Sequence, residues 1–141
     1  MEFTKKEKTL RTVMFLYGIT FVIADLVFIF ASPILFDLLN QIGNLFNLPP
    51  SPPFQNRFYL DLTNSMMVMI AYISFAVYYN PRENFSYMKI LILSKYTSST
   101  FGILFFIFTE RYFSYLTILL TDLPLAIIAH YLYKWVKKEQ K

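Results

Sequence analysis

The sequence predicts an all-α integral membrane protein, a four-transmembrane-helix up-down bundle with an outer interfacial amphipathic helix. Four apolar stretches fill most of the chain, at residues 11–31, 58–79, 88–108 and 112–133. Each can cross the ~30 Å hydrocarbon layer, because an α-helix rises ~1.5 Å per residue. Charged residues make up only 16% of the chain, below the ~25% of soluble domains. Since the length fits one domain, we expect residues 1–141 to form a single membrane unit.

The first stretch, residues 11–31, follows a basic start and therefore resembles a secretory signal sequence. Its apolar run is longer than the core of a typical signal peptide, and no A-x-A cleavage site follows it. We therefore interpret this segment as a retained membrane anchor.

Residues 34–47 show a different pattern after Ser32 and Pro33. Apolar residues recur at helical spacing on one face and polar residues occupy the other, which predicts an amphipathic helix too short to span. We expect it to lie flat on the outer surface of the membrane, between the first and second crossings. The Pro-rich segment at 48–54 then predicts an extended strap, since consecutive prolines exclude a helix.

The remaining three crossings are separated by short connections that set the topology. Asn80 and Pro81 predict the inner turn, and Glu110 with Arg111 marks the outer one. Lys and Arg residues concentrate on the cytoplasmic side of membrane proteins, and an even number of crossings puts both ends on one side. Both arguments predict a multi-pass protein with cytoplasmic termini. The basic residues of that side are Lys5, Lys6, Lys8, Arg11, Arg82, Lys89, Lys134, Lys137, Lys138 and Lys141.

Acidic and amide side chains lie inside the apolar stretches, where a carboxylate is costly and marks a site or a partner. Counting from the inner helix ends at ~1.5 Å per residue places Asp25 at ~21 Å, Asp122 at ~18 Å and Asn64 at ~24 Å. Ser99 falls in the same layer. We therefore predict these four residues as polar ligand-binding residues in the interior of the bundle. The alternative is that each acid is protonated or hydrogen-bonded to a neighbour and serves packing alone.

Lys95 is the fifth candidate site residue, and the sequence does not decide which residue it contacts. The same count places it at ~9 Å, lower than Asp122. Depth alone therefore does not support a direct ion pair with Asp122, because a lysine there can extend its ammonium toward the inner surface.

Composition and motifs exclude several classes of function. The chain has no cysteine and one histidine, so disulfides, thiolate metal sites and a bis-histidine haem within one chain are excluded. It contains no P-loop, dinucleotide fingerprint, H-E-x-x-H or G-x-S-x-G motif. The basic residues sit at segment ends, which topology explains without a nucleic-acid partner. We expect no cofactor and no metal, and we predict no catalytic residue.

The order of features resembles the DoxX-like group of small four-helix membrane proteins. One stretch carrying the resemblance runs from Leu10 to Asn40, with L-Y-G-I-T-F-V-I-A-D-L followed by S-P-I-L-F-D-L-L. The other is Y-N-P-R at residues 79–82. The resemblance covers the layout and implies a four-helix bundle; some members of that group are membrane subunits of quinone-linked oxidoreductases. Acids within four short helices are also similar to the sterol-isomerase and sigma-two receptor group, from which no site residue transfers.

These observations leave three hypotheses for function. The first is a non-enzymatic protein, either a small subunit of a membrane complex or a binder of a small amphipathic, lipid-like ligand. The second is a proton-coupled transporter of small solutes, which needs an oligomer because four helices are few for a pathway. The third is a lipid-modifying isomerase with one acid as proton donor and another as base. Expected partners are membrane lipid and other membrane subunits or further copies of the chain.

Overall fold

The computed structural model describes residues 2–52 and 57–138, and within these ranges it contains four helices and no strand. The helices are α1 (Lys5–Leu45), α2 (Arg57–Tyr79), α3 (Tyr87–Phe108) and α4 (Phe113–Lys137). All four are long and apolar enough to cross a membrane. The structure thus confirms the all-α fold and the four long apolar helices that the sequence predicts.

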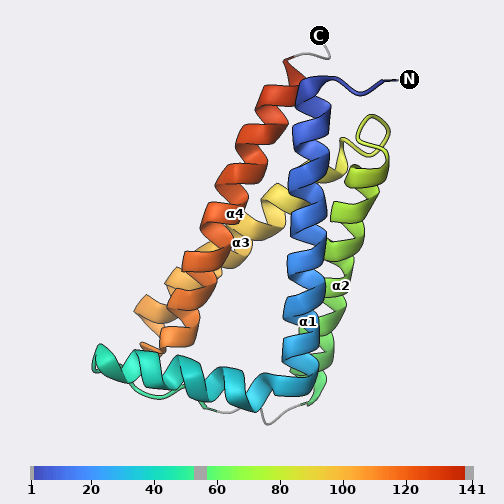
Figure 1. Ribbon diagram of the computed structural model, residues 1–141. Coiled ribbons are helices and arrows are strands. Elements are labelled where there is room, and N and C mark those ends of the chain that lie inside the picture. The colour runs from blue at the N-terminus through green and yellow to red at the C-terminus, as the bar shows by residue number, and fades with distance from the viewer. Residues whose placement is uncertain (1, 53–56, 139–141) are drawn as a thin grey trace.

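Helix α1 bends sharply at the end of its first apolar stretch. Ala31 has non-helical dihedrals (φ −135°, ψ 19°), and Pro33 follows two residues later. Proline removes a backbone donor and its ring crowds the preceding turn, which accounts for the bend. Beyond it, residues 32–45 form an arm that crosses the foot of the bundle (Figure 1). The sequence predicted two separate helices here, and the structure joins them through a kink.

The arm ends at Leu45, two residues before the predicted boundary. Asn47 takes a left-handed conformation with φ 55°, and the N–H of Leu48 donates to the carbonyl of Gly43 at 3.1 Å. This bond satisfies a carbonyl of the last helical turn, and asparagine tolerates the left-handed conformation better than most residues.

The strap is non-helical at residues 48–52, as predicted, while residues 53–54 lie outside the described part of the chain. The amide of Asn40 holds Ser51 through two bonds, donating to its carbonyl at 3.2 Å and accepting from its N–H at 2.8 Å. The Ser51 hydroxyl lies 2.8 Å from that of Ser114 at the start of α4. The strap therefore ties the arm to α4.

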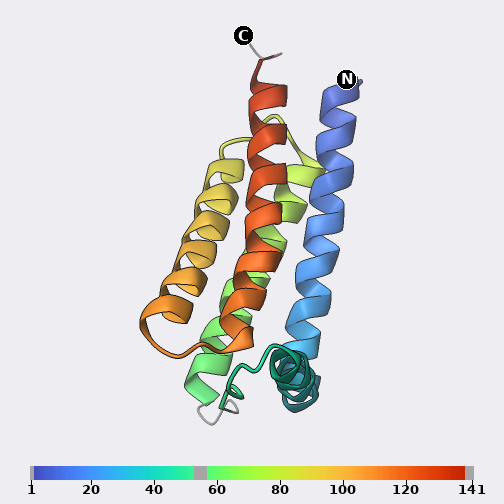
Figure 2. The same ribbon diagram turned by 90° about the vertical axis from the view of Figure 1, so that its left-hand side faces the viewer.

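The four helices pack as two antiparallel pairs. Helix α1 packs chiefly on α2, and α3 packs chiefly on α4, with fewer contacts between α1 and α4 and fewest between α2 and α3. The helices run alongside one another when viewed with the arm end-on (Figure 2). In Figure 1, α1 and α4 lie together at the end that carries both termini and diverge toward the arm.

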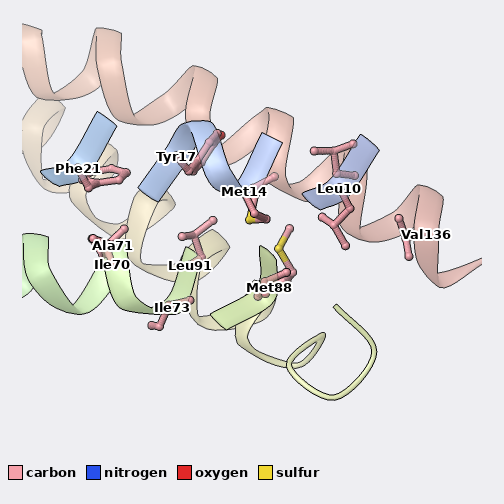
Figure 3. Close-up of a cluster of buried hydrophobic side chains, with 13 residues drawn as sticks. Leu10, Met14, Tyr17, Phe21, Ile70, Ala71, Ile73, Met88, Leu91 and Val136 are labelled. Atoms are coloured by element: carbon pink, nitrogen blue, oxygen red, sulfur yellow. The ribbon is translucent and has the colours of Figure 1, made fainter. Parts of the chain in front are cut away.

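The buried apolar core occupies one half of the bundle. We call this the terminal half and define it as residues 5–21, 70–79, 87–99 and 126–137; the distal half is residues 22–31, 60–69, 100–108 and 113–125. Every buried hydrophobic side chain of the described residues lies in the terminal half (Figure 3). They are Leu10, Met14, Tyr17, Phe21, Ile70, Ala71, Ile73, Val77, Met88, Leu91, Ala126, Ala129, Leu132 and Val136.

An ion pair fastens the start of α1 to the turn between α2 and α3. Thr4 and Glu7 form a capping box, in which the Glu7 carboxylate accepts the Thr4 N–H at 2.8 Å. The same carboxylate receives Arg82 through Nε at 2.6 Å and Nη2 at 2.9 Å. The Arg82 guanidinium lowers the pKa of Glu7 below its usual value. Both groups belong to the end of the bundle, outside the predicted crossings.

Candidate functional site

The central polar feature is an ion pair between α3 and α4. Lys95 Nζ lies 3.0 Å from Asp122 Oδ1, and only 7% and 15% of these two side chains are exposed. The hydroxyl of Ser98 donates to the other carboxylate oxygen, Oδ2. A buried charge needs a partner and further hydrogen bonds to offset its lost hydration, and Asp122 has both.

The structure corrects the depth argument that disfavoured this pair. The count treated each residue as a point on its helix, whereas the lysine side chain has four rotatable methylenes that bring its ammonium to Asp122. The register of α3 on α4, in which Gly102 lies against Tyr115 and Ile118, also places Asp122 nearer to the level of Lys95 than the count from the helix ends implied. Extension of Lys95 toward the inner surface, which the sequence suggested, is therefore not what the structure shows.

Two aromatic residues of α1 cover the ion pair from the opposite helix pair. Lys95 Nζ lies 4.1 Å from the centroid of the Phe21 ring, a geometry in which the ring face attracts the ammonium. One turn earlier, the Tyr17 hydroxyl donates to the carbonyl of Leu125 at 2.5 Å. These contacts join α1 to both α3 and α4 at the level of Asp122.

Of the two adjacent serines on α3, the predicted one makes a different contact. Ser99 is buried, but its hydroxyl donates to the carbonyl of Lys95 on its own helix at 2.8 Å. Ser98 is the residue that binds Asp122. A helix puts residues three and four apart on one face, so spacing from Lys95 favoured Ser98 and Ser99 equally. Only the rotation of α3 against α4 distinguishes them.

The other two predicted residues, Asp25 and Asn64, present buried oxygens without partners. Asp25 Oδ1 and Asn64 Oδ1 are both shielded from solvent, and neither accepts a hydrogen bond. Asp25 lies one turn beyond Phe21, on the same face of α1 as the buried residues of the terminal half. Each side chain as a whole is partly exposed, so it sits at the edge of the packed region.

The register between α1 and α2 places these two residues at about the same level. Arg11 Nε donates to the carbonyl of Tyr78, and the Phe75 ring lies where a Cβ on Gly18 would fall. Continuing this antiparallel register puts Asp25 opposite residues 64–68, the turn that begins with Asn64. The adjacent helices of one pair therefore bring two unsatisfied acceptors to one depth.

Asp25 and Asp122 differ in their partners. In the described part of the chain, no hydrogen bond or ion pair links them, and Asp122 is engaged by Lys95 and Ser98. The five candidate residues instead divide into a closed cluster, which we call the Lys95–Asp122 cluster, and an open pair of acceptors at Asp25 and Asn64. Sequence reasoning missed Ser98 and Phe21 in the closed cluster. Phe21 lies four residues after Tyr17, so a helix places both on one face, and this spacing could have indicated Phe21.

Other polar groups lie apart from this region. His130 Nδ1 lies 3.3 Å from the Tyr96 hydroxyl, which gives the lone histidine a neighbour. A hollow of about 420 Å³ opens between the arm and the strap, lined by Asp37, Asn40, Gln41, Asn44, Leu48 and Pro50. The residues with described positions include no group of three acidic or histidine side chains arranged to hold a metal ion.

No protein-family model, curated protein or solved structure matches this chain. The likeness to DoxX-like proteins therefore stays a prediction, and functional inference rests on the geometry.

Proposed function

We propose that this chain is a non-enzymatic integral membrane protein that holds a small amphipathic molecule between its two helix pairs, in the distal half. One observation carries the proposal: the distal half combines exposed apolar side chains with the unpartnered oxygens of Asp25 and Asn64. A bilayer offers no water to satisfy such oxygens, and an unsatisfied buried acceptor costs about 1–3 kcal/mol. A ligand with an apolar body and a polar end satisfies both features.

The divergence of the helix pairs supports this location. Phe28 continues the inner face of Phe21 on α1, and Leu119 continues that of Ala126 on α4. Both are partly exposed, whereas Phe21 and Ala126 are buried. The arm joins the two pairs at the foot of the bundle through the stacked rings of Phe46 and Phe113, whose centroids lie 6.0 Å apart. The distal half is thus bounded by packed contacts at both ends and apolar along its sides.

The Lys95–Asp122 cluster supports the proposal by closing the terminal half. Its charges are paired with each other, hydrogen-bonded by Ser98 and covered by Phe21. A ligand gains little by competing for groups that are already satisfied. The cluster therefore marks the inner limit of the site, and Asp25 lies just beyond it.

Purification in a mild detergent followed by mass spectrometry of bound molecules tests the proposal. We expect a small amphipathic molecule to be enriched on the protein well above its share in the source membrane. Bound lipid in the same proportions as the membrane would contradict it. Stoichiometric recovery of partner proteins without such a molecule would instead support a subunit of a larger complex.

A second candidate, a proton-coupled transporter acting as an oligomer, is favoured by the Lys95–Asp122 cluster. A carboxylate held by an ammonium and a hydroxyl at membrane depth is a group that binds and releases a proton when its partner moves. Reconstituted vesicles carrying Asp122→Asn should lose proton-coupled flux if this is the function. Flux equal to that of the unmodified protein would exclude the candidate.

We also propose that both termini lie on the cytoplasmic side. Both lie at the same end of the bundle, where the basic residues concentrate (Figure 1). The chain has no cysteine, so single cysteines at Thr9 and at Thr109, near opposite ends of the helices, would be the only reactive thiols. In intact cells a membrane-impermeant thiol reagent should label the second variant and spare the first. The reverse labelling would overturn the orientation.

A further inference from the structure

The unpartnered oxygens of Asp25 and Asn64 select a chemical class of ligand. Oxygens of this kind accept hydrogen bonds and donate none while the carboxylate is ionised. The two lie at about the same level on adjacent helices, as the α1–α2 register shows. A single polar group placed between them would meet two acceptors.

Four donors on neighbouring turns are already engaged and do not serve these oxygens. Lys95 Nζ binds Asp122, and the Ser98 hydroxyl does the same. On α2 the Ser65 hydroxyl donates to the carbonyl of Asp61 at 2.8 Å. On α1 the Thr20 hydroxyl donates to the carbonyl of Leu16 at 2.9 Å. The fold therefore supplies two acceptors at this level, while these donors are bonded to other acceptors.

We infer that the polar end of the bound amphiphile is a hydrogen-bond donor, an ammonium or a hydroxyl, received by Asp25 and Asn64. The inference rests on the proposed function and names its ligand class. An ammonium gains most, because a hydrogen bond to a charged group contributes about 1.5–3 kcal/mol, against about 1 kcal/mol between neutral groups. A carboxylate or phosphate end would instead oppose the Asp25 carboxylate and leave both acceptors unsatisfied.

Apolar side chains beside Asp25 provide the surface for the rest of the molecule. On α1, Phe28 lies one turn from Asp25, continues the inner face of Phe21 and is partly exposed. On α2, Met67 lies one turn from Asn64, packs against the edge of the buried core and is also partly exposed. An unbranched alkyl chain can lie along these faces as a lipid tail would.

A series of probes with one tail and different polar ends tests the inference. The full chain is reconstituted in nanodiscs of phosphatidylcholine, whose headgroup has no N–H or O–H donor and cannot occupy the acceptors. Binding of dodecylamine, dodecanol, dodecanoate and dodecane is measured by titration against empty nanodiscs. We expect the amine to bind at least about tenfold more tightly than the carboxylate, with the alcohol between them.

Matched substitutions locate the effect. Asp25→Asn removes the charge and keeps the shape, so amine affinity should fall about tenfold while alcohol affinity changes less. Asn64→Leu should weaken both donors. Asp61→Asn is the control, because Asp61 is exposed one turn away on α2 and should leave every affinity unchanged.

The outcomes separate the inference from the proposed function. If dodecanoate or dodecane binds as tightly as the amine, the ligand class is wrong, although a site for amphiphiles remains. Unchanged amine affinity in Asp25→Asn would likewise overturn the inference. If no probe binds above the empty nanodisc, both the ligand class and the proposed function fail. The probe series on the unmodified protein decides these points even where a variant does not fold.

Discussion

The terminal and distal halves are built from the same four helices, yet only the terminal half has a closed core. On the inner face of α1, Leu10 and Met14 are fully buried, whereas Phe28, which continues that face into the distal half, is partly exposed. Residue type does not explain this, because both halves are rich in leucine, isoleucine and phenylalanine. Helix spacing does, since the two pairs touch in one half and diverge in the other (Figure 1).

Small residues on the inner faces explain where the helices meet. Ala71, Ser74, Ala126 and Ala129 are buried in the terminal half, and Gly18 packs against the Phe75 ring. In lipid, helices associate through close packing rather than through release of water, so small residues favour contact. Apolar length therefore makes a helix suited to a membrane, and the positions of small residues decide which faces meet.

The largest expected effect comes from breaking the ion pair where the halves join. Asp122→Leu leaves the Lys95 ammonium without its carboxylate, which should lower the free energy of unfolding by about 3–5 kcal/mol. The double variant Lys95→Met/Asp122→Leu should recover much of this loss, since no unpaired charge remains. Denaturant titration in detergent micelles measures both. Asp61→Leu, at an exposed site, should change the stability by less than about 0.5 kcal/mol.

A double variant no more stable than Asp122→Leu would show that the pair contributes through packing. A loss below about 1 kcal/mol in Asp122→Leu would show that water reaches the ion pair, which then stabilises the fold as little as an ion pair on a protein surface.

Truncating one leucine in each half compares their packing directly. Leu10→Ala removes a fully buried side chain from the terminal half and should cost about 2–4 kcal/mol, because a cavity remains. Leu119→Ala, on the inner face of α4 in the distal half, should cost about 1 kcal/mol, because that side chain is only partly buried. Thermal unfolding of both variants under one condition gives the comparison. Equal losses would mean that the distal half is as closely packed as the terminal half.

Gly102 tests whether the divergence lies between the helix pairs or also within them. A Cβ there would lie 2.9 Å from the backbone carbonyl oxygen of Tyr115, so α3 and α4 must separate to accept it. Gly102→Ala should therefore cost about 1–3 kcal/mol although it lies in the distal half. Gly18→Ala is the comparison, since its Cβ meets the Phe75 ring, which rotates more easily than a backbone moves. A neutral Gly102→Ala would show that α3 and α4 also diverge.

The smallest effect concerns the Glu7–Arg82 ion pair at the terminal end, and it depends on pH. Arg82 lowers the pKa of Glu7, so the pair stabilises the fold above the ordinary glutamate value of about 4.3. This contribution is lost as the pH falls through the lowered pKa of the folded state. From pH 7 to pH 3, the unmodified protein should therefore lose more stability than Glu7→Gln. Identical pH profiles from thermal unfolding would show that the pair contributes nothing.

The sequence predicted part of the candidate site. The polar residues Asp25, Asn64, Lys95 and Asp122 were readable as candidates, because charges and amides are rare inside apolar stretches. The residue that each of them contacts could not be predicted from the sequence. Ser98 and Ser99 are adjacent on one helix, and one residue of rotation decided that Ser98 meets Asp122 while Ser99 bonds its own helix.

The sequence by itself determined the four long apolar segments and their order, the strap at 48–52 and the connecting turns. These features follow from local periodicity, apolar length and proline placement, which do not depend on distant residues. Tertiary structure alone decided that Lys95 binds Asp122 rather than Asp25 and that the two helix pairs diverge. Those outcomes depend on helix rotation and separation, which arise from side-chain packing between residues far apart in the chain.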